Sequence, residues 1–210
     1  MAQATGQVMW TSCRCRKIVE PTFERPAPTL ASLRFEVFSA LAYGSQGIIF
    51  NTYANTPNNA DQKFSNAPVD NNGNKTATWY LVQQVISEIK RYTDVFLGGI
   101  PVAIRHTGSM VYPGATPLSG EIGPCLSVNS RNAGVLVSHF ANHGDNYLII
   151  VNHDFQNAQP LSLKFASNRI VTELTTVNLD QVANTVVNSD GTRTIARTLQ
   201  AGGYLIFKWF

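Results

Sequence analysis

The sequence predicts an α/β region followed by an all-β region: about two βα units of a (β/α)8 barrel over residues 1–100, a connector over residues 101–130, and an antiparallel β-sandwich over residues 131–210. Two observations predict this order. In the first hundred residues, apolar patterns of helical and strand type alternate, as they do in α/β barrels. After Arg131, short β-branched and aromatic runs follow one another, with turn residues between them and no helical pattern.

The α/β region begins with a strand candidate at residues 7–13, centred on Val8, Met9 and Trp10. A polar loop that contains prolines follows at residues 14–28. The first helix is predicted next, because apolar residues recur there at helical spacing. These residues are Leu30, Leu33, Val37, Ala40 and Leu41.

Both ends of this helix carry boundary signals. Thr29, which follows a proline, is a suitable N-cap. Gly44 suits the left-handed conformation that ends many helices, because it has no Cβ to clash. The uninterrupted apolar run from Ile48 to Phe50 then predicts a parallel strand at residues 47–53 that is covered on both faces.

A loop at residues 54–75, rich in Asn, Asp, Pro and Gly, separates this strand from a second helix predicted at residues 76–97. A loop of this length is usually functional. A closed barrel needs eight strands and about 250 residues, so two units leave open sheet edges, which folded proteins normally avoid. The sequence therefore predicts that this region is a piece of a larger unit.

The all-β region is predicted to contain five short strands and two hairpin turns. The strands occupy residues 135–140, 147–152, 161–165, 170–177 and 204–209. The turns are predicted at the sequences His143-Gly144-Asp145-Asn146 and Ser189-Asp190-Gly191, which are rich in turn-forming residues.

Composition argues against several classes of function. Only 14% of the residues are charged, and the net charge of +3 forms no basic stripe, so nucleic-acid binding is not expected. No run of about 18 apolar residues is present, so no membrane span is predicted. The N-terminus has neither a basic nor an apolar signal region, which predicts a cytoplasmic protein for the chain as it stands; a periplasmic or secreted location stays open for a chain that lacks its natural N-terminus.

Neither a cofactor nor a metal site is predicted. Cys13 and Cys15 lie too close together to bridge each other and lack C-x-x-C spacing, so they are expected to be free thiols. His139 and His143 have H-x3-H spacing, but they fall on a predicted strand and turn, where residues four apart do not share a face. No glycine-rich dinucleotide motif follows a strand.

Residues 26–57, PAPTLASLRFEVFSALAYGSQGIIFNTYANTP, resemble the barrel-closing segment of bacterial glycoside hydrolases of the family 42-like, β-galactosidase-related type. The LAYG-x-QGI core is the most specific part of this match. Similar stretches follow in order at residues 70–76, 102–108, 147–155 and 202–209. The resemblance implies that the strands at residues 7–13 and 47–53 are the seventh and eighth of a barrel, so that the chain holds its last two βα units and an accessory β-sandwich.

The chain departs from the family pattern at the ends of both strands. Where the family has Tyr-Trp after the last strand, this chain has Tyr53-Ala54, and Asn51 replaces a preceding Phe. In the first strand Trp10 is retained, but residues 11–15 replace the rest of the aromatic pattern. Such changes are expected both if the active site has drifted and if the gene is damaged or truncated.

Glycoside hydrolysis usually needs two carboxyl groups, one on each side of the scissile bond. The strand that would carry the acid/base is not in this chain, and residues 7–13 contain no acid where the nucleophile is expected. Glu20 and Glu24 lie in the loop beyond, and Glu20 is the catalytic candidate, with a solvated loop glutamate as the alternative. Glu36, on the first helix, is expected to form a surface or inter-helix ion pair.

Four residues are candidates for substrate binding. Tyr53 and Trp10 offer aromatic rings for the apolar C–H face of a sugar, near strand ends where barrel sites form. Simple core packing is the alternative for both rings. Asn51 and Asn55 offer side-chain amides for sugar hydroxyls.

The expected function is that of the C-terminal fragment of a glycoside hydrolase that acts on β-linked saccharides, galactose-containing ones included. The fragment is expected to be inactive by itself, because its catalytic carboxylates are incomplete. Its expected partners are carbohydrate and either the missing barrel half or further copies of itself. The alternatives are a non-catalytic carbohydrate-binding or structural β-domain protein and a truncated pseudo-enzyme.

Overall fold

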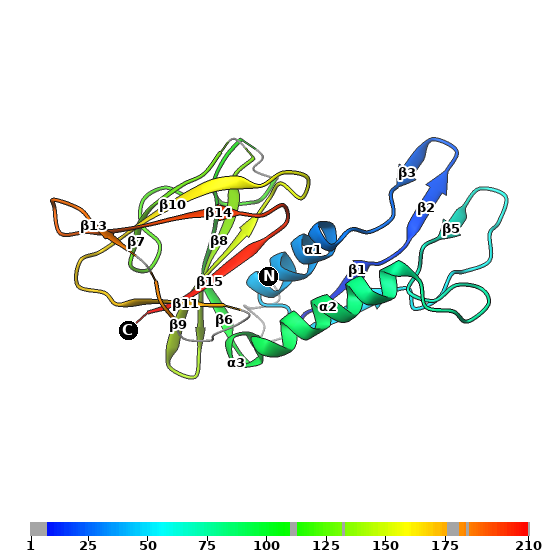
Figure 1. The fold of residues 1–210 in the computed structure, drawn as a ribbon, viewed down its shortest axis with the longest axis horizontal. Helices are drawn as coiled ribbons and strands as arrows, with labels where there is room; N and C mark the ends of the chain where they lie inside the picture. The colour runs from blue at the N-terminus through cyan, green and yellow to red at the C-terminus, as the bar shows by residue number, and fades with distance from the viewer. Residues whose placement is uncertain (1–7, 110–112, 132, 176–180, 184, 210) are drawn as a thin grey trace.

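The computed structural model describes residues 8–109, 113–131, 133–175, 181–183 and 185–209. The chain is mostly β-structure with few helices, and most of its strands lie in antiparallel sheets. The β-rich half occupies one end of the molecule, and a parallel strand pair with its helices and a projecting arm forms the other (Figure 1).

Two antiparallel sheets make up the β-rich half. The larger has the strand order β12-β11-β15-β9-β8-β6 and the smaller the order β13-β14-β10-β7. The larger sheet consists of β6 (Ile100–His106), β8 (Val135–Asn142), β9 (Asp145–Asn152), β11 (Val171–Leu174), β12 (Gln181–Val182) and β15 (Tyr204–Trp209). The smaller sheet consists of β7 (Cys125–Asn129), β10 (Gln159–Phe165), β13 (Val186–Val187) and β14 (Arg193–Leu199).

The central strands of the six-stranded sheet are buried on both faces. On β9, Leu148 and Ile150 belong to a core shared with the four-stranded sheet, whereas Ile149 and Val151 belong to a second core shared with the helices. The residues alternate between the two cores because successive side chains of a strand point to opposite faces. Two-sided burial explains why this antiparallel strand has the continuous apolar run that is more typical of parallel sheets.

The segment predicted as a connector at residues 101–130 supplies a strand to each sheet. β6 pairs with β8 and β7 pairs with β10, both in antiparallel register. Both strands are only partly buried, and β6 contains Pro101, a residue that argues against a strand when the sequence is considered alone. β14 is a further strand that the sequence pattern does not predict. Its Ile195 and Leu199 are buried, whereas Ala196 and Thr198 on the other face are exposed, as fits an outer sheet with one exposed face.

Both predicted hairpin turns are confirmed. His143 and Gly144 join β8 to β9 with φ values of +49° and +85°, as a two-residue hairpin loop requires. Gly191 has a φ of +79° in the turn between β13 and β14. In that turn the Asn188 N–H donates to the Thr192 carbonyl at 2.8 Å.

The other half of the molecule is built on a parallel pair formed by β1 (Trp10–Arg14) and β4 (Gly47–Asn51). The first strand therefore begins later than predicted, and residue 7 lies outside the described residues. Helix α1 (Leu30–Ala42) connects the two strands and begins as predicted, with Thr29 and Ser32 in a reciprocal capping box.

The end of α1 and the course of the second helix also follow the sequence. Gly44 has a φ of +90° just after α1, which confirms its predicted role. The helix predicted at residues 76–97 is present in two parts, α2 (Ala77–Arg91) and α3 (Thr93–Phe96), which meet at Tyr92.

A small antiparallel arm rises beyond the carboxyl ends of the parallel strands (Figure 1). It consists of β2 (Lys17–Glu20), β3 (Phe23–Arg25) and β5 (Lys63–Ser65). The loops predicted at residues 14–28 and 54–75 thus contain paired strands. These strands are short, and none of their residues is fully buried. The second partner of β2 is β5, which lies far along the chain.

A buried ion pair and a cluster of rings join the two halves. Arg34 of α1 donates to both carboxylate oxygens of Glu88 of α2, at 2.9 and 2.5 Å, and the Tyr204 hydroxyl of β15 donates to the same carboxylate at 3.3 Å. The Tyr204 ring stacks on Phe38 of α1, with centroids 3.5 Å apart. Both helices are therefore fixed to the six-stranded sheet.

The parallel strands are covered on one face only, so the expectation of cover on both faces is wrong. Cys13 and Phe50 face α1. Cys13 belongs to the core that contains α1, and Phe50 packs against this core. On the opposite face Trp10 is 64% exposed and Ile49 is 49% exposed. Among the described strands, β1 and β4 pair only with each other, so each has an open edge.

Replacing Glu88 with Gln should lower the free energy of unfolding by about 2–3 kcal/mol, because the largely buried Arg34 loses the carboxylate with which it pairs. Urea unfolding followed by circular dichroism measures this loss. The matched control is Glu24→Gln, which removes the exposed Lys17–Glu24 pair and should cost less than about 1 kcal/mol. Equal losses in the two variants would contradict the role assigned to the Arg34–Glu88 pair.

Candidate functional site

The carboxyl ends of β1 and β4 form the candidate site, because parallel strands present functional groups at this edge. Arg14 and Asn51 lie opposite each other in register there, on the face that also carries Ile49. The Arg14 guanidinium donates to the backbone carbonyls of Arg16 and Pro26, the latter at 2.8 Å. A guanidinium and an amide can bind hydroxyl or anionic groups, but they supply no general base at neutral pH.

A carboxylate lies behind these strand ends, on the face covered by α1. Glu36 accepts a hydrogen bond of 2.9 Å from the backbone N–H of Arg14, and burial raises the pKa of its carboxyl group. The surface or inter-helix ion pair expected for Glu36 is therefore wrong. Its position three residues after the buried Leu33 is a signal that it lies on the packed side of α1.

The structure separates Trp10 from the other candidates. In the parallel register Trp10 lies opposite Gly47, at the amino ends of both strands. The indole lies across Gly47 so closely that an added Cβ would come within 2.5 Å of the ring. The prediction that Trp10 lies on the side where barrel sites form is wrong, because the strand begins at this residue instead of ending near it.

Tyr53 lies just beyond the end of β4 but is turned towards α2. Its ring, 66% exposed, makes an edge contact with Trp79 at a centroid distance of 6.0 Å. The Lys75 ammonium lies 4.6 Å from the centre of the Trp79 ring. Tyr53 is accessible to a ligand, but it does not lie over the strand ends together with Trp10.

The remaining candidates are held by structural hydrogen bonds or lie in the arm. The Asn55 side chain accepts from the Ala67 N–H at 3.1 Å and so orders the loop after β4. Glu20, at the tip of the arm, accepts from the Gln62 side chain at 2.8 Å. Glu24 pairs with Lys17. Of the sequence-predicted residues, only Asn51 lies at the carboxyl end on the open face, and the structure adds Arg14.

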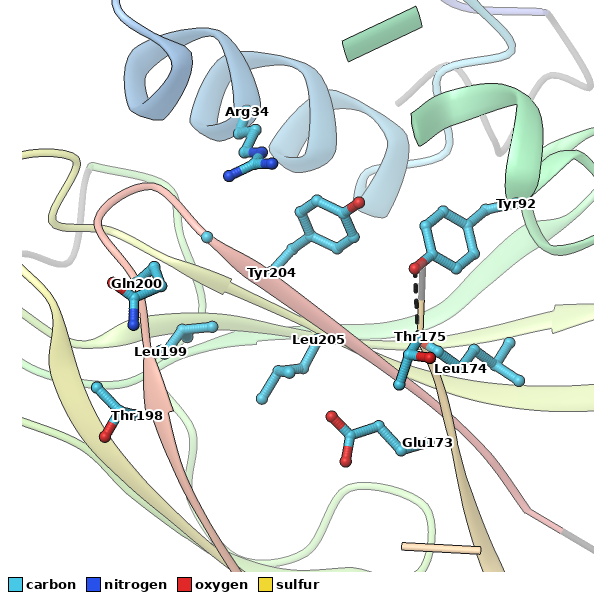
Figure 2. A pocket seen from close by; sticks show the side chains of 11 residues that line it. Arg34, Tyr92, Glu173, Leu174, Thr175, Thr198, Leu199, Gln200, Tyr204 and Leu205 are labelled. Atoms are coloured by element: carbon cyan, nitrogen blue, oxygen red, sulfur yellow. Dashed lines mark hydrogen bonds between the residues drawn. The ribbon is translucent and has the colours of Figure 1, made fainter. Parts of the chain in front are cut away.

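A cleft of about 250 Å³ lies where α1 meets the ends of the β-rich sheets (Figure 2). Its charged groups are already paired, Arg34 with Glu88 and Glu173 with Arg197. Burial raises the pKa of Tyr204 far above its usual value and also raises that of Tyr92, so both hydroxyls stay protonated. The described residues of the cleft therefore include no activated nucleophile or base. Arg34, Tyr92 and Tyr204 instead belong to the contact between the helices and the six-stranded sheet, which we call the joint.

A buried histidine pair lies at the same joint. The Tyr43 hydroxyl is 2.7 Å from His106 Nε2, and His106 Nδ1 is 3.0 Å from His153 Nε2. Burial lowers the pKa of both imidazoles, and the neighbouring His106 contributes to lowering that of His153 to about 4. Neutral rings allow one N–H to lie between the two histidines, whereas two imidazolium ions would repel.

Other reactive groups give no site within the described part of the chain. Burial raises the pKa of Cys13 and Cys125 to about 12 and that of Cys15 to about 11, so these thiols are not activated nucleophiles. Within the described residues, no group of three His, Cys, Asp or Glu side chains is placed to hold a metal ion. None of the described helices is both long and apolar enough to span a bilayer.

Comparison with known proteins gives no assignment: no family model and no curated protein matches this chain.

The free energy of unfolding should decrease as the pH is lowered, because the buried His153 becomes protonated more easily in the unfolded chain. His153 has a pKa of about 4 in the folded protein and about 6.5 when unfolded, so the unfolded chain binds more protons between these values. The stabilisation is fully present above about pH 6.5 and is lost towards pH 4, a change on the order of 3 kcal/mol.

Urea unfolding at a series of pH values from 7 to 4 measures this slope. His153→Gln should be less stable at pH 7 but should flatten the slope, because it removes the titrating ring. His143→Asn, in the exposed hairpin turn where Asn tolerates the positive φ, should keep the full slope. A His153→Gln slope equal to that of the unchanged protein would show that other groups cause the acid sensitivity.

Proposed function

We propose that this chain is the C-terminal part of a glycoside hydrolase of the family 42-like, β-galactosidase-related type, acting on β-linked saccharides. The observation that carries the proposal is a parallel pair, β1 and β4, that is connected through α1 and followed by α2. The short arm strands β2, β3 and β5 lie in the intervening loops. A parallel strand pair joined by a helix is the repeat unit of an α/β barrel. It coincides with the LAYG-x-QGI sequence that resembles the barrel-closing segment.

In this proposal β1 and β4 are the last two strands of a barrel, and the two later sheets form an accessory β-sandwich. The face that carries Trp10, Ile49 and Asn51 then points into the barrel, and its exposure is explained by the absent strands. Arg14 and Asn51 lie at the end of the barrel where sites form, and their donors and acceptors suit sugar hydroxyls.

The polypeptide by itself is proposed to be inactive. A pair of carboxyl groups is needed to protonate the leaving group and to attack or activate water. Of the described carboxylates near the strand ends, Glu36 lies behind the sheet and Glu20 lies out in the arm. Neither faces the open side of β1 and β4.

The alternative, an independent carbohydrate-binding domain, is less favoured by the β-rich half. A groove of about 570 Å³ crosses the outer face of its four-stranded sheet. The groove is lined by Asn129, Ser130, Arg131, Pro160, Leu161, Ser162, Ala196, Arg197 and Thr198. No aromatic ring is among these side chains, so a sugar would find no flat apolar face there. The extensive joint with α1 and α2 supports a role in holding the α/β half.

The coding sequence that precedes residue 1 tests the proposal. An in-frame region of roughly 200 residues with βα repeats and acidic residues at strand ends is expected, since a barrel needs about 250 residues in all. A stop codon or an unrelated gene at that position would contradict the proposal.

The chain alone should release no nitrophenol from aryl β-galactosides above the buffer rate, because it lacks a facing carboxylate pair. Glu20→Gln should behave identically in the same absorbance assay. Steady hydrolysis by the unchanged chain that is lost in Glu20→Gln would overturn the claim of inactivity and make Glu20 catalytic.

A further inference from the structure

The cleft where α1 meets the β-sheets combines charged, uncharged polar and apolar side chains in one small space (Figure 2). Its volume of about 250 Å³ lies just below the range of about 300–1,000 Å³ that is typical of sites for drug-sized ligands. Its walls come from α1, β11, β14 and β15, and neither β1 nor β4 contributes to them. The cleft is therefore separate from the strand ends of the parallel pair.

The two charged side chains of the cleft each keep one hydrogen-bonding position outside their ion pair. Arg34 donates to Glu88 through Nε and Nη2, so its Nη1 group takes no part in that pair. Arg197 donates through Nε and Nη2 to a single oxygen of Glu173, Oε2, which leaves Oε1 outside the pair. The cleft thus offers a donor on the α1 side and an acceptor on the β11 side, and its charges cancel.

Two uncharged polar side chains of the cleft, Thr198 and Gln200, are exposed. Among the interactions of the described residues, neither side chain takes part in a hydrogen bond. A hydroxyl and a carboxamide can each donate and accept. Leu174 and Leu205 add apolar surface to the same cleft. A matching ligand therefore has hydroxyl groups around an apolar body.

We propose that this cleft binds a neutral saccharide unit of about one sugar ring. Ring hydroxyls accept from Arg34 Nη1 and from the Gln200 amide, and a further hydroxyl donates to Glu173 Oε1, because a hydroxyl can do both. The C–H face of the ring lies against the leucine side chains. An ionic ligand is disfavoured, since both charged groups of the cleft are already paired and an added charge would lose water without gaining a partner.

The site requires both halves of the molecule. Arg34 comes from α1, whereas Glu173 and Gln200 come from the β-rich half, so an isolated β-domain would not form it. A bound sugar that bridges these groups also strengthens the joint, because Arg34 is one of its members. The inference does not rest on the proposed function, since no strand of the parallel pair lines the cleft.

Nuclear magnetic resonance of the full chain tests this site, with D-galactose, D-glucose and D-mannose as probes, each titrated well above a millimolar Kd. Saturable shifts of the Gly203 and Leu205 backbone amides and of the Arg34 Nε–H are expected with at least one of the three sugars. Glycine, a small zwitterion, should cause none. No saturable shift with any sugar, or an equal or greater response to glycine, would overturn the proposal.

Gln200→Ala should raise the Kd of the bound sugar by about three- to tenfold, because it removes one direct hydrogen bond. The matched control is Gln156→Ala, in the loop between β9 and β10, where the side chain is exposed and does not line the cleft. This control should keep the Kd of the unchanged chain. Both changes affect exposed side chains, so the circular dichroism spectra and thermal midpoints should also stay the same. An unchanged Kd in Gln200→Ala, or equal weakening by both variants, would show that the sugar binds elsewhere.

Discussion

The buried ion pair between Arg34 and Glu88 ties together three elements that are distant in the sequence. Each helix contributes one charge, and the Tyr204 hydroxyl of β15 donates to the shared carboxylate. Two charges buried at a joint are tolerated only when they are paired and hydrogen-bonded, so α1, α2 and the six-stranded sheet are held in one arrangement. The stacked rings of Phe38 and Tyr204 add apolar contact at the same point.

This joint gives the six-stranded sheet its unusual position. One face packs on the four-stranded sheet and the other on the helices, so its middle strands have no solvated side. Buried polar residues of this half are hydrogen-bonded: the Ser138 hydroxyl donates to the Ala42 carbonyl of α1 at 2.8 Å, and the Asn152 amide donates to the Gln200 carbonyl at 2.9 Å. The β-rich half therefore acts as a platform that fixes the helices, and through them the parallel strands.

The parallel pair contrasts with this platform. It has helical cover on one face, exposed apolar residues on the other and an open edge beside the apolar groove between β4 and α2. Burial of apolar surface contributes about 25 cal/mol per Å², so such a surface favours association. The proposed function follows from this imbalance between a well-packed platform and an incomplete pair.

Local signals in the sequence determined the parts that depend on neighbouring residues. The capping box at Thr29, the left-handed Gly44 and the His143-Gly144 turn follow from short-range sterics and hydrogen bonding, and the strands of the sheet core follow from apolar runs. Only the tertiary structure decided which strands pair across distance, as β6 does with β8 and β2 with β5. It also decided that Trp10 and Tyr53 lie apart and that Glu88 is buried, because strand register and ion pairing arise from contacts that no local pattern records.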